Sequence, residues 1–247
     1  MEIPAVTERT RMRLSDPDAN LVCTDRDIYE SCLALDDAEV LDLGCGRAEH
    51  ARAIADAHHR ARVVAMEVDT VQHEINCGSQ RPANLRFAFG GAQAIPADDS
   101  TFDVVLMFKS LHHVPGHLLD RALAEVARVL RPGGIAYVCE PIFAGPLNDI
   151  MRIFHDEQQV RRNAFEALER AVDSGTFTLI EERFFAVPTR FRDFAEFEQR
   201  VLRATHTRHD LQPWQMEAVR DRFAACMTPA GAQFVAPQRL DLLRKPA

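Results

Sequence analysis

Short apolar segments alternate with amphipathic ones between residues 40 and 139, and this alternation constrains the fold more than any other feature. Five of the apolar segments are predicted to be strands because they are short and often β-branched: 40–43, 62–66, 85–89, 103–108 and 135–139. The segments between them that place apolar residues at helical spacing are 49–57, 70–77 and 118–130. This alternation predicts a doubly wound, mostly parallel α/β sheet with helices on both faces.

The C-terminal part of the chain has a different pattern. A long helix is predicted over 148–172, and shorter helices over 193–204 and 214–226. Two further strands are predicted over 177–187 and 233–243. We expect these strands to complete a seven-stranded sheet as an antiparallel pair, with the helical insertions forming a cap.

Composition and charge narrow the class of protein. The 247 residues carry a formal net charge of −8, so we expect no nucleic-acid partner, because such binding depends on clustered Lys and Arg. No apolar run reaches the roughly 20 residues of a membrane span, and residues 1–20 lack the apolar stretch of a secretory signal. The six cysteines form no CxxC pair. We therefore expect a cytoplasmic chain with free thiols and no membrane partner.

A glycine-containing segment, Asp-Leu-Gly-Cys-Gly at 42–46, follows the first predicted strand and precedes the first helix. Glycine allows a positive φ and has no side chain, so the backbone can turn sharply and approach a ligand. Glu67 ends the second predicted strand, where an acidic side chain can accept hydrogen bonds from ribose hydroxyls. Together these features favour an adenosine-type cofactor over a coincidental tight turn.

Two classes of adenosine cofactor fit this pattern, a dinucleotide and S-adenosylmethionine. The dinucleotide fingerprint needs a third glycine, and Glu49 occupies that place. An acidic residue at the start of a helix would also repel a pyrophosphate. The sequence therefore disfavours a dinucleotide.

Further stretches carry a resemblance to a known family. VLDLGCGRA followed by VVAMEVD resembles the first two motifs of the class I, seven-stranded S-adenosylmethionine-dependent methyltransferases. The later motifs of this family are resembled by the stretches FAFGGAQAIPADDSTFDVVLMFKSLHHV and ARVLRPGGIAYVCEP. The resemblance covers residues 38–141, whose sequence is similar to the quinone and sterol methyltransferases. The resemblance implies in-line transfer of a methyl group from S-adenosylmethionine to an O, N, S or C atom of a small molecule, with S-adenosylhomocysteine as product.

The resemblance also implies roles for matched positions. Asp42 would orient the glycine loop and the methionine amino group, and Glu67 would bind the ribose diol. Val68 would pack on the adenine, the amide of Ala92 would bond to it, and Phe108 would lie near the sulfonium. The complete set of expected cofactor-binding residues is Asp42, Gly44, Cys45, Gly46, Glu67, Val68, Gly91, Ala92, Gln93 and Phe108.

One position departs from the family pattern. An acidic residue usually precedes the position of Ala92 and binds the adenine amino group, and this chain has Gly91 there. Gln93 or a main-chain carbonyl are candidate replacements, and a cofactor-binding protein without catalysis stays open as an alternative. Asp69 is expected to cap the following helix rather than to bind the ribose.

Adjacent histidines follow the fourth predicted strand, at the expected mouth of the active site. His113, His112 and Glu140 are the catalytic candidates, because imidazole and carboxylate groups can act as general bases. A purely structural role for one histidine is equally compatible with the sequence. His112, His113 and His117 form an alternative metal set, but we expect no metal because their spacing does not define a ligand geometry. The run 155–157 is predicted to lie on a solvated helix face.

The expected organisation has three parts: a segment with a lid helix at 1–37, the S-adenosylmethionine-binding core at 38–143, and the cap with the last two strands at 144–247. Residues 24–35, with Tyr29, are expected to cover the site. The expected partner is a small-molecule acceptor. A homodimer and the methylation of protein or RNA stay open as alternatives.

Overall fold

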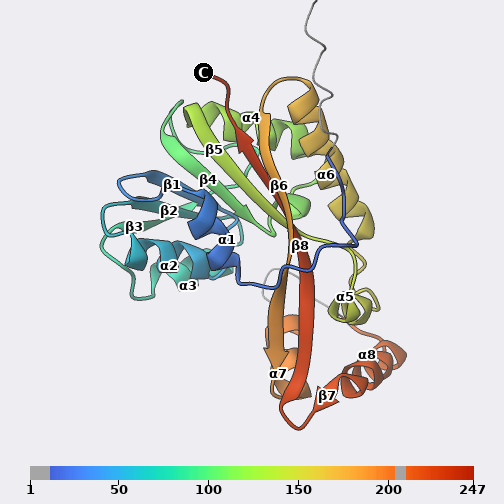
Figure 1. The fold of residues 1–247 in the computed structure, drawn as a ribbon. Helices are drawn as coiled ribbons and strands as arrows, with labels where there is room; N and C mark the ends of the chain where they lie inside the picture. The colour runs from blue at the N-terminus through green and yellow to red at the C-terminus, as the bar shows by residue number, and fades with distance from the viewer. Residues whose placement is uncertain (1–11, 204–209) are drawn as a thin grey trace, which may run out of the picture.

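A single mixed sheet forms the centre of the structure, a computed structural model that describes residues 12–203 and 210–247 (Figure 1). Its strands lie in the order β3-β2-β1-β4-β5-β8-β6. The parallel strands are β1 (Glu39–Leu43), β2 (Arg62–Glu67), β3 (Leu85–Phe89), β4 (Phe102–Phe108) and β5 (Leu130–Pro141). Strand β8 (Gly231–Arg244) runs antiparallel between β5 and β6 (Thr178–Phe191).

This topology confirms the predicted doubly wound sheet with a C-terminal antiparallel strand pair. All seven predicted strands are present. The structure adds a two-residue strand, β7 (Met227–Thr228), which pairs with the first residues of β8. Strand β1 lies between β2 and β4 and is parallel to both. The carboxyl ends of these three strands therefore meet at one edge of the sheet, where ligands bind in such folds.

Helices cover both faces of the sheet. The helices are α1 (Asp25–Cys32), α2 (Glu49–Ala57), α3 (Thr70–Cys77), α4 (Leu119–Val129), α5 (Pro146–Met151), α6 (Gln158–Asp173), α7 (Phe194–Phe197) and α8 (Pro213–Ala225), with short turns η1 (Leu111–His113), η2 (Gly116–Leu118) and η3 (Glu198–Leu202). Successive residues of a strand point to opposite faces. Leu41 and Val105 therefore pack with α4 and α6, whereas Val40 and Leu106 pack with α1 and α2.

The predicted long helix over 148–172 is wrong, because the structure divides it into α5 and α6. Residues 152–157 leave the helical path between them. The carboxylate of Asp156 accepts a hydrogen bond from the amide of Gln158, 3.0 Å away, and so starts α6 separately. Glu157 is then turned inward, where it pairs with Arg161 and approaches His112. Apolar periodicity did not reveal the break because both halves continue the same amphipathic pattern.

The antiparallel strands β6 and β8 extend beyond the other strands of the sheet, and the far end of this pair carries α7 and α8 (Figure 1). A separate apolar cluster holds this end together, and its members are Ile150, Phe191, Phe197, Leu202, Val219, Phe223, Ala232 and Phe234. Phe191 and Phe197 thus belong to the core under the cap. Phe185 belongs instead to the core beside α1. The last residue of the helix predicted over 193–204 lies outside the described residues.

Two composition-based expectations can be compared with the structure. All six cysteines are free thiols, as predicted. Within the described parts of the chain, no helix combines the length and the apolar character needed to cross a membrane.

Candidate functional site

The glycine loop after β1 is fixed by contacts with the ends of β2 and β4. The amides of Gly44 and Cys45 donate to the carbonyl of Met66 at 2.9 and 3.0 Å. Gly44 has a φ of +76°, and a Cβ atom on it would lie 2.6 Å from Cβ of Ser110. The Ser110 hydroxyl in turn donates to the carbonyl of Leu43 at 2.8 Å. Only glycine fits at position 44 without displacing the segment that follows β4.

Glu67 connects the glycine loop to the end of β2. Its Oε2 accepts the amide of Gly46 at 2.7 Å, and its Oε1 accepts the amides of Val68 and Asp69 at 2.8 and 2.9 Å. The carboxylate is buried and lies where the resemblance expects the ribose ligand. Asp69 accepts the amide of Val71 at 2.9 Å, which confirms its prediction as the N-cap of α3.

Asp42 supplies a second buried carboxylate close to the loop. Burial, with a smaller contribution from nearby Glu67, raises the pKa of Asp42 to about 7. A carboxylate in this environment gains from a cationic partner such as the methionine ammonium group, because the partner would stabilise the ionised form.

The region beyond Glu67 carries exposed apolar side chains. Val68 and Phe89 are 58% and 50% exposed, and both flank the carboxyl end of β2. A Cβ atom on Gly91 would lie 2.6 Å from Oε1 of Gln93, so the Gln93 amide occupies the space beside this glycine. This position favours Gln93 as the replacement for the acidic residue that the family usually has. Ala92 is buried next to it.

The end of β4 brings the predicted lid helix to the same place. Phe108 stacks on the ring of His50 at 3.9 Å and lies 5.9 Å from the ring of Tyr29 on α1. Lys109 follows with a φ of +54°, a region that costs energy for residues other than glycine. Its Nζ lies 3.2 Å from Oδ2 of Asp25, so an ion pair attaches the start of α1 to the end of β4. The lid role of 24–35 stays a prediction.

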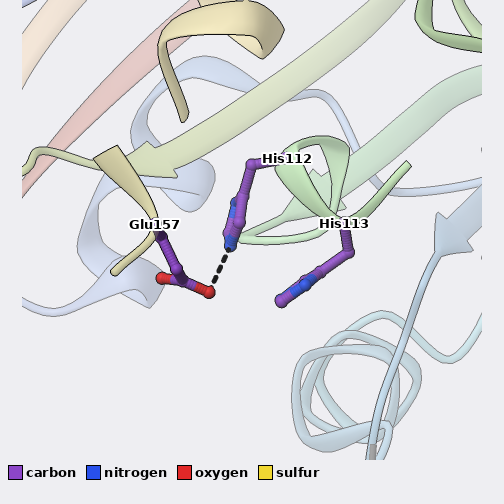
Figure 2. Close-up of side chains that lie close together, drawn as sticks. All are labelled: His112, His113 and Glu157. Carbon is purple, nitrogen blue, oxygen red and sulfur yellow. Dashed lines mark ion pairs between the residues drawn. The ribbon is translucent and has the colours of Figure 1, made fainter. Parts of the chain in front are cut away.

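A buried ionic network surrounds His112. Its Nδ1 bonds to Oε2 of Glu140, and its Nε2 lies 3.6 Å from Oε1 of Glu157 (Figure 2). Burial alone would lower the pKa of His112, but the two carboxylates raise it to about 9. Glu140 is buried too, which opposes its ionisation. His112 and the amide of Leu111 nevertheless hold its pKa below the ordinary value.

A cavity of about 310 Å³ lies beside this network. Its polar lining includes Lys109, His112, His113, His155, Glu157 and Arg161. The apolar lining comes from residues that follow β5, from α5 and from β8, and includes Ile142, Leu147, Met151 and Pro237. The cavity therefore combines an apolar wall with a polar end next to the segment after β4.

The catalytic candidates separate into two positions. His112 and His113 line the larger cavity. Glu140 does not line it, and the catalytic role of Glu140 stays a prediction. Its two oxygens bind His112 and the amide of Leu111, so the carboxylate lies behind His112 and borders a smaller cavity of about 120 Å³. Glu140 therefore positions His112 and the η1 turn.

The sequence did not predict Glu157 as part of the site. The run 155–157 was expected on a solvated helix face, but Glu157 is 6% exposed. It pairs with Arg161, and its Oε1 lies 2.9 Å from Nε2 of His155. The spacing of Glu157 and Arg161 by four residues is a detectable signal, although it equally predicts an ordinary surface pair on a helix.

Substitutions in the glycine loop should differ in severity. Gly46→Ala adds only the cost of a positive φ, about 1–2 kcal/mol, because no atom lies within 4 Å of the added Cβ. Gly44→Ala adds the clash with Ser110 to this cost. Its Kd for S-adenosylhomocysteine should therefore rise by well over a factor of about ten, and a factor of ten corresponds to about 1.4 kcal/mol. Isothermal titration calorimetry on both variants checks this order. Equal losses would contradict the role of the Gly44–Ser110 contact.

Comparison with known proteins identifies similar sequences and structures. Residues 40–134 match the family described as a methyltransferase domain. The chain is 36% identical over 110 residues to the fatty-acid O-methyltransferase of Mycolicibacterium smegmatis, over 43% of this chain and 39% of the relative. It is 33% identical over 107 residues to the demethylmenaquinone methyltransferase of Staphylococcus epidermidis, over 42% of this chain and 43% of the relative. The chain thus spans about two fifths of the length of these curated relatives.

Solved structures extend the likeness to nearly the whole chain. A SAM-dependent methyltransferase from Methanosarcina mazei has a TM-score of 0.53 at 16% identity, covering 89% of this chain and 97% of that structure. At this identity the likeness shows the fold alone. The strand order agrees with this likeness. Residues 40–134 match the methyltransferase-domain family, and the chain has the fold of this SAM-dependent methyltransferase.

Proposed function

We propose that this chain is an S-adenosylmethionine-dependent methyltransferase whose acceptor is a small molecule bound in the 310 Å³ cavity. The observation that carries the proposal is the position of residues 109–113 between two sites. Ser110 contacts the glycine loop, whereas Lys109, His112 and His113 line the cavity. A donor at the loop and an acceptor in the cavity would therefore meet across one short segment.

The residues at the loop fit S-adenosylmethionine. Gly46 has no atom within 4 Å of the place of a Cβ and so leaves the backbone open for the methionine end, and the buried Asp42 offers a carboxylate for its ammonium group. Glu67 lies where it can accept the ribose hydroxyls, and Val68 is an exposed apolar surface for the adenine. When bound, the cofactor supplies a methyl group already activated by its sulfonium.

The protein then has to hold the acceptor in line with that methyl group. Orienting two reactants in this way can supply about 7–11 kcal/mol of the barrier. The apolar wall of the cavity favours an acceptor with an apolar body, and the polar end favours a nucleophilic atom close to His112 and His113. The names of the two relatives, which act on a fatty acid and on demethylmenaquinone, support an acceptor of this kind.

The experiment that tests the proposal has a binding step and a turnover step. S-Adenosylhomocysteine should bind in calorimetry, and labelled S-adenosylmethionine should transfer its methyl group to members of a panel of long-chain carboxylic acids and reduced quinones. The absence of S-adenosylhomocysteine binding at millimolar concentration would contradict the proposal. Binding without transfer to this panel, or to protein and RNA added as further acceptors, would favour a cofactor-binding protein without catalysis.

Removal of the Glu67 carboxylate should weaken cofactor binding. Glu67→Ala removes charge-assisted hydrogen bonds to the ribose, each worth about 1.5–3 kcal/mol, so the Kd for S-adenosylhomocysteine should rise at least tenfold. Asp69→Asn is the matched control, because it changes the next acidic residue and keeps the N-cap. If Glu67→Ala binds as tightly as this control, Glu67 has no role in ribose binding.

Cofactor affinity should also depend on pH through Asp42, whose pKa is raised to about 7 by burial. The ionised carboxylate, which predominates above pH 7, binds the ammonium group. Below pH 7 binding requires loss of a proton, so affinity should fall by up to about tenfold per pH unit. Calorimetry between about pH 5.5 and pH 8.5 measures this slope. Asp42→Asn should bind weakly at every pH, and a flat wild-type profile would contradict the assignment.

A further inference from the structure

We propose that His112, His113 and Glu157 form a binding site for a divalent transition-metal ion at the polar end of the cavity. One ring nitrogen from each histidine and one carboxylate oxygen lie within 4.8 Å of one another. The two rings project from the η1 turn, and Glu157 approaches them from the start of α6 (Figure 2). Two imidazoles and one carboxylate bind Zn²⁺ or Fe²⁺ and leave coordination positions open for a further ligand.

The surroundings of His112 resemble those of a metal-bound histidine. Its Nδ1 bonds to Glu140, and the other oxygen of Glu140 accepts the amide of Leu111 at 3.0 Å. Histidines that bind metals almost always donate their second ring N–H to a carboxylate or carbonyl, which fixes the ring and its tautomer. When the proton on the opposite nitrogen leaves, that nitrogen offers its lone pair to the ion. Here that nitrogen, Nε2, is the one that faces Glu157 at 3.6 Å.

Glu157 is held so that one oxygen can bind an ion. Arg161 binds Oε2, and Oε1 faces His112. Oε1 also lies 2.9 Å from Nε2 of His155, and an ion would replace this contact. Ligand atoms about 2.0–2.2 Å from one ion are separated by about 3.3 Å, so the group has to contract. His113 is exposed and lines the cavity beside His112.

The charges around the site accept a cation in place of a proton. Glu140 and Glu157 are both buried carboxylates that flank His112, Arg161 pairs with Glu157, and the ion would take the place of the His112 proton between the two carboxylates. A dication would leave the group with an excess of positive charge that faces the cavity. This charge suits an oxygen atom of an acceptor, whose ionisation a bound metal favours as it does for water. That role rests on the proposed function, in which His112 and His113 would then be metal ligands rather than bases.

The set also explains why histidine spacing alone did not predict a metal. The candidates in the sequence were His112, His113 and His117, but His117 is not part of the cluster. The third ligand comes from residue 157, which the fold brings to the η1 turn across the boundary between α5 and α6. His117 is exposed on the adjacent turn and therefore serves as a matched control.

The test uses the full chain after removal of metal with a chelator. Zn²⁺ in calorimetry and Co²⁺ in visible absorption should each show one ion bound per chain, whereas Mg²⁺ should not compete, because it prefers oxygen ligands. His113→Ala and Glu157→Gln should each weaken Co²⁺ binding at least tenfold and remove its visible bands. His117→Ala should bind Co²⁺ as the wild type does.

Two results would overturn the site: no Co²⁺ or Zn²⁺ binding by the wild type at millimolar ion, or equal losses in His113→Ala and His117→Ala. S-Adenosylhomocysteine binding, measured on the same samples, separates this outcome from failure of the proposed function. Cofactor binding without metal binding rejects only the metal site. Metal binding without cofactor binding rejects the proposed function and keeps the site. Cofactor affinity retained by Glu157→Gln shows that this variant is folded.

Discussion

The contact between Gly44 and Ser110 is the constraint on which the rest of the site depends. It allows the loop after β1 to lie directly against the Ser110 side chain in the segment after β4. The amides of Gly44 and Cys45 then reach Met66 at the end of β2, and Gly46 reaches Glu67. Three strand ends are thereby fixed relative to one another, which is the rigid support that a preorganised binding site requires.

The fold could be predicted because its signals are local. Each parallel strand and each of the helices α2, α3 and α4 corresponds to a periodic segment, and β3 and α2 begin and end at the predicted residues. The predictions of helices and strands fail where tertiary contacts determine the local structure. The helix predicted over 148–172 breaks beside Glu157, whose buried side chain approaches His112, a residue distant in sequence. Local propensity carries no information about this contact.

The same distinction applies to the site. Asp42, the glycines and Glu67 follow the strands that position them, so their places could be inferred from the order of elements. The use of Glu140 could not be inferred, because a carboxylate at a strand end has the same signature whether it faces a ligand or supports a neighbouring histidine. Its contacts with His112 and Leu111 decide between these uses. Glu157 required the three-dimensional path of the chain between α5 and α6.

The walls of the cavity and the glycine loop come from different parts of the chain. The family match ends at residue 134, whereas most residues that line the cavity come later, on the segment after β5, on α5 and on β8. In the proposed function, donor recognition and acceptor recognition would thus depend on largely separate stretches of sequence, joined by residues 109–113. Substitutions can accumulate in the later stretch and reshape the pocket while the loop at 42–46 stays intact. A new specificity can arise in this architecture without rebuilding the half that holds the donor.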